Sequence, residues 1–415
     1  MGTVYEKTVT SPVNIAVIKY WGKRDTNLIL PTNSSLSVTL SQDHLQSKTT
    51  IRASPDFEKT RLWLNGVEDT AIEKNKRLQN CLSETRRLRK EYEERLRKDK
   101  NVDNVIPLSE YNLHICSENN FPTAAGLASS ASGFACLAYT LSQIYELPIS
   151  TTELSKIARQ GSGSACRSLF GGFVAWEMGF QDDGSDSQAV QIASQDHWPE
   201  LEALICVVSD TKKDTSSTEG MQNTVNTSTL LRHRIEHVVP LRMKSMIKAI
   251  HERDFQKFAE ITMQDSNQFH ALCLDTYPPI FYLNDVSRAI IRVITEYNSS
   301  NPERKLKAAY TFDAGPNAVI YTTSENVPEI INLIAKYFPG NENTRDYFSD
   351  PFQLFVGKTI GEQPLPLGFN DQIIPVFPKG NVKQILHTKV GDGPKVVAGE
   401  FDGLLNKQGW PKKLK

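Results

Sequence analysis

The sequence predicts an α+β fold divided into two domains, and three observations support this prediction. Runs with strand character alternate with helical runs along the chain, without an internal repeat. The chain has 415 residues, which is too long for a single hydrophobic core. A proline-containing break at 197–200 separates two such mixed segments. We therefore expect an N-terminal domain over residues 1–198 and a C-terminal α+β domain over 199–415, whose final strand, 382–390, can return to the first domain.

The composition is that of an ordinary soluble protein and argues against several functional classes. The chain has 47 basic and 48 acidic residues, whereas proteins that bind nucleic acid or membrane surfaces usually carry a basic excess. The N-terminus lacks the apolar stretch of a signal peptide, and no apolar run approaches membrane-spanning length. The six cysteines are scattered, without C-x-x-C or zinc spacing. We expect reduced, mostly buried thiols in a cytoplasmic protein.

The first elements are predicted to be strands. Val13–Tyr20 is rich in Ile, Val and Ala and predicts a buried strand, followed after a polar turn by a second strand at Ser35–Leu40. Thr49–Ser54 and Arg61–Gly66 predict two more strands, the last ending in an Asn-Gly turn.

Two polar residues, Asn14 and Lys19, interrupt the first apolar run. An unpaired amide or ammonium inside a buried strand would be costly. Each side chain therefore either points to solvent, bonds to the backbone or belongs to a functional site, and the pattern alone leaves these alternatives open.

A long amphipathic helix is predicted from Ala71 to about Lys98, where apolar residues recur three or four positions apart. Its charges of both signs favour a solvated face with i,i+4 pairs over a nucleic-acid-binding arm. The extended run Leu113–Asn119 then predicts a strand, and Gly133–Leu147 predicts a second helix.

The segment PTAAGLASSA, Pro122–Ala131, lies between that strand and helix and is a candidate phosphate-binding loop. Its small side chains let a ligand approach the backbone, and the following helix N-terminus presents unpaired N–H groups to an anion. The segment lacks the G-K-[ST] of a Walker A loop and the G-x-G-x-x-G of a dinucleotide site. A tight loop that caps a core helix would fit the same residues.

A second candidate anion site is the segment GSGSACR, 161–167, which follows a predicted helix that begins at Ser150–Thr152 and runs through Gln160. Its two glycines, two serines and one arginine form a flexible, hydroxyl-rich turn that suits an anion. A flexible turn without a ligand fits equally well. The acidic loop 180–188 looks too exposed to bind a metal.

The C-terminal half is predicted to continue with alternating strands and helices. DAGPNA places Asp313 on a sharp turn at a strand end, where turn formation is the alternative to a catalytic role. The loop-rich stretch Asn341–Lys379 has no assigned element. The predicted segments are a strand at Leu201–Asp210, a hydroxyl-rich loop at Lys212–Met221, a helical region through Arg253, helices at Phe255–Gln268, Pro278–Tyr297 and Val327–Tyr337, and strands at Lys307–Asp313, Asn317–Thr323 and Val382–Val390.

A phosphate loop, a hydroxyl-rich arginine turn, a strand end that carries Asn14 and Lys19, and a turn-borne aspartate are together sufficient for phosphoryl transfer, which needs positioning and charge neutralisation more than covalent chemistry. These features lie in four strings, NIAVIKYWGKRD, NNFPTAAGLASSASGFACLAY, GSGSACRSLFGGFVAW and AYTFDAGPNAV. On these strings the chain closely resembles the mevalonate diphosphate decarboxylase family of the GHMP kinase superfamily. The resemblance extends from about Ser11 to Leu386.

The resemblance implies a two-domain GHMP-kinase-like fold with the active site in the cleft between the domains. It implies ATP-dependent decarboxylation of (R)-5-diphosphomevalonate to isopentenyl diphosphate, ADP, phosphate and CO2, through phosphorylation of the C3 hydroxyl, in the mevalonate route to isoprenoids and sterols. It also implies a homodimer whose partners are small molecules, without nucleic acid or membrane. ATP implies Mg2+, but no carboxylate cluster in the sequence indicates its ligands.

The same resemblance implies residue roles. Asp313 would face the C3 hydroxyl, Arg167 would bind the substrate carboxylate, and Asn14 would hold Arg167 in place. Ser129 and Ser130 would meet the transferring phosphate. The rest of the ATP-binding loop would be Pro122, Ala124, Ala125, Gly126, Leu127 and Ala128. Further substrate contacts would be Tyr20, Trp21, Gly22, Lys23, Arg77, Ser162, Gly163, Ser164, Ala165, Cys166 and Thr218, of which Arg77 rests on the short string RLQNCL.

Two other functions fit parts of the sequence. A GHMP small-molecule kinase would stop at phosphorylation, but WGKRD and GSGSACR match the decarboxylase and not the kinases. A non-catalytic module that binds phosphorylated metabolites would keep the pocket, but the presence of Asp313, Arg167 and Lys23 argues against it. Detection of released CO2 would distinguish a decarboxylase from a kinase. An ATPase assay with substrate would distinguish an enzyme from a non-catalytic binding module.

Overall fold

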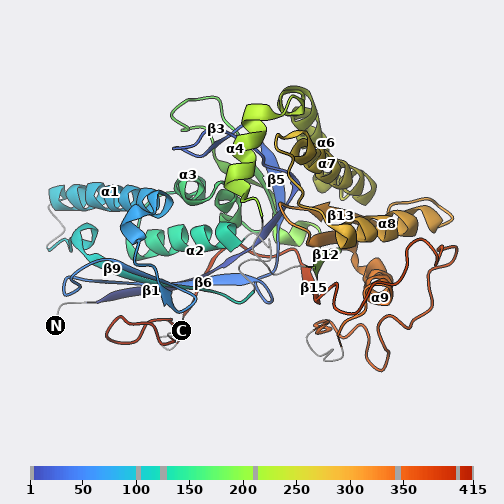
Figure 1. Ribbon diagram of the computed structural model, residues 1–415. Helices are drawn as coiled ribbons and strands as arrows, with labels where there is room; N and C mark the ends of the chain where they lie inside the picture. Colours follow the sequence, from blue (N-terminus) through green and yellow to red (C-terminus); the bar gives the residue numbers. More distant parts are fainter. Residues whose placement is uncertain are drawn as a thin grey trace.

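A computed structural model describes residues 4–99, 104–121, 129–208, 214–341, 347–398 and 402–413. Helices and strands are mixed along the whole chain (Figure 1), which confirms the predicted α+β class. In the described part of the chain, the strands form two larger sheets in the N-terminal half, one in the C-terminal half and a short two-stranded ribbon.

The N-terminal half contains a six-stranded sheet of order β16-β1-β6-β9-β7-β8 and a four-stranded sheet of order β11-β10-β5-β2, counted over the described residues. The ribbon β3-β4 follows β2 directly. The strands are β1 (Tyr5–Pro12), β2 (Asn14–Ile18), β3 (Lys23–Asp25), β4 (Leu30–Pro31), β5 (Ser35–Thr39), β6 (Gln46–Ser54), β7 (Arg61–Leu64), β8 (Val67–Glu68), β9 (Asn112–Asn119), β10 (Phe173–Trp176), β11 (Ala189–Ala193) and β16 (Lys395–Val396).

Three helices cover one face of the larger sheet (Figure 1): α1 (Lys76–Lys98), α2 (Ser129–Ile144) and α3 (Thr151–Gly161). Helix α2 packs directly on β1, β6 and β9, and α1 and α3 pack on α2. The predicted start of α3 is confirmed by a capping box, in which Ser150 and Glu153 each accept a hydrogen bond from the other's N–H. Helix α1 begins later than predicted because Asn75 caps it by accepting from Leu78 N–H.

The C-terminal sheet has the order β13-β14-β12-β15, and both of its faces are buried. Alternate residues of a strand point to opposite faces. Leu204 and Cys206 of β12 pack with α8 and α9 in one hydrophobic cluster, whereas Ile205 packs with α6 and α7 in another. The elements are β12 (Leu201–Val207), β13 (Ala308–Phe312), β14 (Ala318–Thr323), β15 (Gln384–Lys389), α4 (Ser217–Thr227), α5 (Leu230–His233), a π-helical turn (Arg234–Val238), α6 (Val239–Glu252), α7 (Phe255–Asp275), α8 (Asp285–Ser300) and α9 (Val327–Tyr337).

One hydrophobic cluster joins the two halves of the chain. Ile15 and Val38 of the N-terminal half share it with Ile205 and Tyr321 of the C-terminal half. The Tyr321 hydroxyl also donates to the Ile15 carbonyl at 3.2 Å. Helix α7 packs on β2 from one half and on β13 and β14 from the other. The two halves therefore hold each other in one fixed arrangement.

The end of the chain returns to the N-terminal half by a different strand from the one considered in the sequence. The segment 382–390 contributes β15, which pairs antiparallel with β12 and therefore stays in the C-terminal sheet. Its last residue, Val390, bridges to Leu40, and the next short strand, β16, pairs with β1. The division of the chain between residues 198 and 199 stays a prediction.

Other expectations from the composition can be compared directly. All six cysteines lie in the described part of the chain, and all are buried thiols, as predicted. No described helix combines the length and the apolar character that a membrane span requires. The described part of the loop-rich stretch, residues 341 and 347–379, consists largely of turns and bends, and Tyr347, Phe355 and Phe369 anchor it in the C-terminal core.

Candidate active site

A cavity of about 390 Å³, with several charged and hydroxyl-bearing residues in its wall, lies where the two halves of the chain meet. The end of β2, the start of α2, the segment after α3, the start of α4 and the turn after β13 all contribute to its walls. The lining residues are Asn14, Ala16, Lys19, Tyr20, Trp21, Lys23, Ile29, Arg77, Ser129, Ser130, Ser162, Gly163, Ser164, Arg167, Ser216, Ser217, Thr218, Met221, Phe269, Asp313 and Ala314.

Among the described residues that line the cavity, Asp313 is the one that carries a carboxylate. It follows β13 on a tight turn, in which Gly315 N–H donates to the Asp313 carbonyl at 2.7 Å. Its Oδ1 accepts a hydrogen bond from Lys19 Nζ at 2.7 Å, and the Asp313 side chain keeps 31% of its surface exposed. Lys19 is almost fully buried and also donates to the Ala16 carbonyl. The ion pair orients Asp313 and leaves part of its carboxylate facing the cavity.

Arg167 also lines the cavity, as a buried cation held by neutral groups. Its Nε donates to Asn14 Oδ1 at 3.2 Å and to Ser37 Oγ at 2.9 Å, and its Nη1 donates to Ser35 Oγ at 2.6 Å. None of the described carboxylates forms an ion pair with it. Burial lowers the pKa of Arg167, and the nearby Cys166 and Asp313 act in the opposite direction. A buried guanidinium without a counter-ion is suited to an anionic ligand.

Asn14 has the geometry of a residue that orients Arg167. Its Oδ1 accepts from Arg167, while its Nδ2 donates to Ser168 Oγ at 2.8 Å and to the Ser164 carbonyl at 3.1 Å. The amide is therefore fixed from both ends. Ser164 and Ser168 both belong to a largely buried 3-10 helix, Gly163–Leu169, which contains most of the GSGSACR segment. The prediction of a flexible turn for that segment is therefore wrong.

The other end of the cavity is electropositive and more open. Arg77 Nη2 donates to Thr218 Oγ1 at 2.7 Å, which connects α1 to α4. Burial and the nearby Arg77 charge lower the pKa of Lys23 to about 8. The hydroxyl of Tyr20 is buried and has no hydrogen-bond partner among the described residues. Two cations and an unsatisfied hydroxyl can together bind a group that carries several negative charges.

The predicted phosphate loop can be followed only in part, because Pro122–Ala128 lie outside the described residues. Ser129 and Ser130 form the first turn of α2 and line the cavity. Ser130 Oγ lies 3.3 Å from Ser162 Oγ, so the start of α2 meets the segment that carries Arg167.

Three predicted contact residues, Gly22, Ala165 and Cys166, are not among the lining residues. Gly22 has a φ of +93°, and a Cβ there would lie 2.8 Å from Thr32 Oγ1, so the turn requires glycine. Cys166 is buried behind the wall and donates to the Gly163 carbonyl. These residues shape the cavity from behind.

Sequence reasoning missed several residues of the site. The sequence places Lys19 in the strand end expected to serve phosphoryl transfer, but it does not reveal that Asp313 is the partner of its ammonium. Ser35 and Ser37 occupy alternate positions of β5, and this period of two could have indicated one hydroxyl-bearing face. Phe269 and Met221 form an apolar part of the cavity wall, and no sequence pattern indicated that these two residues would line it.

The described residues contain no group of three or more His, Cys, Asp or Glu side chains that could hold a metal ion. A magnesium ion bound with a nucleotide commonly takes phosphate oxygens and water as ligands. Ser129 and Ser130 line the cavity at the start of α2 and would supply protein oxygens to such an ion. The donor set therefore fits a metal that arrives with its nucleotide.

The fold and the cavity together define a protein of the GHMP kinase class, in which a helix N-terminus and a polar cleft bind phosphorylated small molecules. Two family models match the chain: the diphosphomevalonate decarboxylase-like N-terminal domain over residues 11–189, and the mevalonate 5-diphosphate decarboxylase C-terminal domain over residues 203–397. The chain belongs to the mevalonate diphosphate decarboxylase family.

Individual relatives match over nearly the full length. Diphosphomevalonate decarboxylase of Ganoderma lucidum is 60% identical over 413 residues, which cover 99% of this chain and 100% of the relative. A crystal structure of mevalonate 5-diphosphate decarboxylase is 49% identical, with a TM-score of 0.81 and coverage of 97% and 99%. The structure of MDDEF in complex with MVAPP, AMPPCP and magnesium is 27% identical, with a TM-score of 0.71 and coverage of 96% and 100%.

Proposed function

We propose that the chain converts (R)-5-diphosphomevalonate and ATP to isopentenyl diphosphate, ADP, phosphate and CO2. The observation that carries this proposal is that one cavity is lined both by a carboxylate bound to Lys19, Asp313, and by a buried cation without an ion-pair partner among the described residues, Arg167. A substrate that carries both a hydroxyl to be phosphorylated and a carboxylate to be released matches these two groups.

The substrate is oriented by charge. Its diphosphate lies against Lys23 and Arg77, with the Tyr20 hydroxyl as a further donor. Its carboxylate reaches Arg167, and its C3 hydroxyl reaches Asp313. In this proposed orientation, the two reacting groups would lie at the closed end of the cavity and the diphosphate, which does not react, at the open end.

The chemistry then has two stages. Asp313 accepts or orients the proton of the C3 hydroxyl while that oxygen attacks the terminal phosphate of ATP. The bond from C3 to the phosphorylated oxygen then breaks, and the electron pair of the C–CO2 bond forms the new double bond. Positive charge that develops at C3 is stabilised by Asp313. Arg167 positions the carboxylate rather than gripping it tightly, because tight binding of the ground state would oppose the loss of CO2.

ATP enters from the side of α2. The support is the position of Ser129 and Ser130 in the first turn of this helix, where unpaired N–H groups and the helix dipole favour phosphate. The preceding residues, Pro122–Ala128, complete the loop in this proposal. Magnesium bound with ATP would neutralise phosphate charge during transfer.

The test is an assay that measures ADP and CO2 in the same reaction with 5-diphosphomevalonate. Equal amounts of ADP and CO2 are expected. ADP without CO2 would instead indicate a kinase that stops at the phosphorylated intermediate. ATP turnover that is independent of 5-diphosphomevalonate would contradict the proposed substrate.

We further propose a cytoplasmic homodimer. The six buried thiols support a reducing compartment, where cysteines stay unpaired. Family resemblance supports the dimer. Sedimentation equilibrium at micromolar concentration would measure the assembly state, and cell fractionation would test the location.

A further inference from the structure

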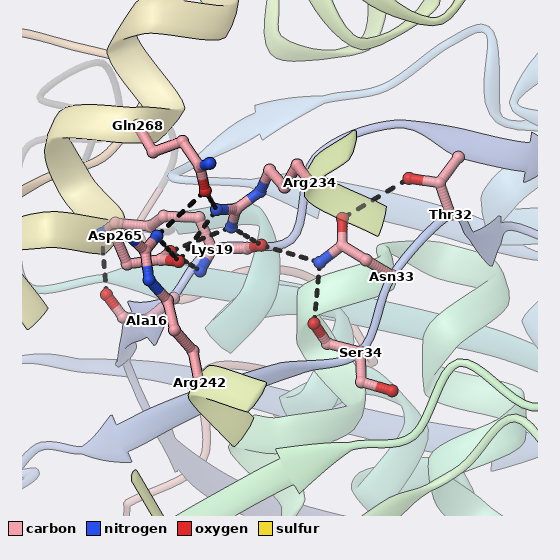
Figure 2. Close-up of polar contacts among 9 residues, drawn as sticks. All are labelled: Ala16, Lys19, Thr32, Asn33, Ser34, Arg234, Arg242, Asp265 and Gln268. Carbon is pink, nitrogen blue, oxygen red and sulfur yellow. Dashed lines mark hydrogen bonds and ion pairs between the residues drawn. The ribbon is translucent and has the colours of Figure 1, made fainter. Parts of the chain in front are cut away.

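A buried charged cluster lies behind the wall of the cavity, beside Lys19 (Figure 2). Arg234 and Asp265 have fully buried side chains and form a bidentate pair, with Nη1–Oδ1 at 2.8 Å and Nη2–Oδ2 at 2.9 Å. Neither side chain is among those that line the cavity. Removing a charge pair of this kind from water is costly, so its presence so close to the site calls for a physical reason.

The Arg234–Asp265 pair forms hydrogen bonds with the main chain of Lys19. Asp265 Oδ2 accepts from Lys19 N–H at 2.7 Å, and Arg234 Nη2 donates to the Lys19 carbonyl at 3.0 Å. Asn33 Nδ2 donates to the same carbonyl at 3.0 Å (Figure 2). Lys19 follows the last residue of β2, so side chains from elsewhere in the chain satisfy its main-chain donor and acceptor in place of a strand neighbour.

The element that carries Arg234 is irregular, whereas Asp265 lies in the regular helix α7. Arg234 is the first residue of a π-helical turn between α5 and α6, and such π-helical turns are frequently found at functional sites. Burial by itself raises the pKa of Asp265, but the Arg234 and Arg242 charges and the Lys19 N–H outweigh it and hold the pKa below its usual value. The carboxylate therefore remains charged and binds both the guanidinium and the peptide.

The ammonium of Lys19 is held at two points, so the fixed main chain and the fixed ammonium together set the path of the side chain. Lys19 Nζ donates to the Ala16 carbonyl and to Asp313 Oδ1, each at 2.7 Å. Both are charge-assisted hydrogen bonds, which are short and sensitive to geometry. A shift of the Lys19 peptide would therefore move the Asp313 carboxylate.

We propose that Arg234 and Asp265 are positioning residues for the reaction: they fix the Lys19 peptide and, through the Lys19 ammonium, hold the Asp313 carboxylate where it meets the substrate hydroxyl. This inference rests on the proposed function. It assigns the buried pair to the rate of the chemical step rather than to substrate affinity.

The chain offers a matched control inside the same cluster. Arg242 Nη1 donates to Asp265 Oδ1 at 3.0 Å and to Gln268 Oε1 at 2.9 Å (Figure 2). Among the hydrogen bonds of the described residues, none joins Arg242 to Lys19. Arg234 and Arg242 thus bind the same carboxylate, but Arg234 alone of these two also holds the Lys19 carbonyl in the described structure.

The experiment compares Arg234→Lys with Arg242→Lys, because each keeps the charge and loses the planar fork. Arg234→Lys is expected to lower kcat by about 10- to 100-fold with KM changed by less than about 3-fold, since small displacements of reacting groups are costly. Arg242→Lys is expected to change kcat by less than about 3-fold. Equal losses in the two variants would overturn the proposal.

A double variant tests whether the effect passes through Lys19. In a Lys19→Met background, Arg234→Lys is expected to change kcat by less than about 3-fold, because coupled residues are not additive. The same loss in both backgrounds would show a general structural role and overturn the proposal.

A second pair of variants covers the case in which Arg234→Lys does not fold. Asp265→Asn keeps the shape of the carboxylate, and Glu93→Gln makes the same change in the buried Arg89–Glu93 pair of α1, which does not line the cavity. A fall in kcat confined to Asp265→Asn is expected, and equal kcat values would overturn the proposal. The wild-type assay separates the two hypotheses. If the wild type forms no ADP and CO2, the proposed function is wrong. If the wild type is active and the Arg234 and Asp265 variants are unaffected, only this inference is wrong.

Discussion

The two ends of the cavity differ in how they hold their charged groups. At the closed end, Arg167 is 2% exposed, and Asn14, Ser35 and Ser37 fix its guanidinium before any ligand arrives. At the open end, Lys23 and Arg77 are partly exposed, and a second hollow of about 690 Å³ shares both residues with the cavity.

This difference separates the contributions of geometry and charge. A preorganised, buried group lowers the barrier of the chemical step because it needs no rearrangement during the reaction. Partly exposed cations attract an anion but are screened by salt and water. Substitutions at the closed end should therefore act on kcat, and substitutions at the open end should act on KM.

The largest effect is expected for Asp313→Asn, which keeps the shape of the side chain and removes its charge. We expect kcat to fall on the order of 10²- to 10⁴-fold, the usual contribution of a general base, with substrate affinity little changed. Single-turnover ADP formation and equilibrium binding of 5-diphosphomevalonate measure the two quantities. Fast turnover would make Asp313 structural, and collapsed binding would make it a ligand anchor.

Arg167→Lys is expected to have the next largest effect. A lysine cannot reproduce the fork that binds Asn14 and the two serines while meeting a carboxylate, so kcat/KM should fall by about 10²-fold. Asn14→Ala, which removes only one support of Arg167, should give a milder loss of the same kind. Steady-state kinetics would contradict the assignment if the lysine variant retained wild-type values.

Arg77→Gln should weaken the open end without slowing the chemistry. The loss of one charge-assisted hydrogen bond to the diphosphate is expected to raise KM about 10-fold and to leave kcat within about 3-fold. The KM of the wild type should also rise more steeply with ionic strength than that of the variant. A variant with a normal KM and a low kcat would contradict the expectation that substitutions at the open end act on KM.

The smallest effect concerns pH. The pKa of Lys23 is lowered to about 8, so in the free protein the ammonium is present below this pH and is lost above it. We expect KM to rise a few-fold, roughly 3-fold, between pH 7 and pH 9, because the open end loses a positive charge. Lys23→Arg, which stays protonated, should abolish this rise; an unchanged KM profile in the variant would remove Lys23 from the explanation.

Features with a local physical cause were predictable from the sequence. The Ser150 cap determines the start of α3, and the Asn65–Gly66 turn between β7 and β8 has the positive φ angles that these residues tolerate. The GHMP-kinase-like fold followed from motif strings. Strand β1, Tyr5–Pro12, was missed because its sequence is mostly polar, and its pairing with β6 and β16 decides its structure.

The parts of the site that escaped prediction depend on contacts between distant residues. Lys19 is separated from Asp313 by 294 positions and from Asp265 by 246. No local pattern encodes which distant group will satisfy a buried ammonium or peptide. The strand pattern could show that Lys19 needed a partner, but the partner follows from how α7 and the β13 turn pack against β2.

The hydrophobic cluster shared by the two halves also bears on how the protein unfolds. Ile15 and Tyr321 are almost completely inaccessible only because each is covered by the other half of the chain or by α7. Separating the halves would expose this apolar surface and break the hydrogen bond from the Tyr321 hydroxyl to the Ile15 carbonyl. Loss of either half thus removes part of the core of the other, so the stability of each half depends on the presence of its neighbour.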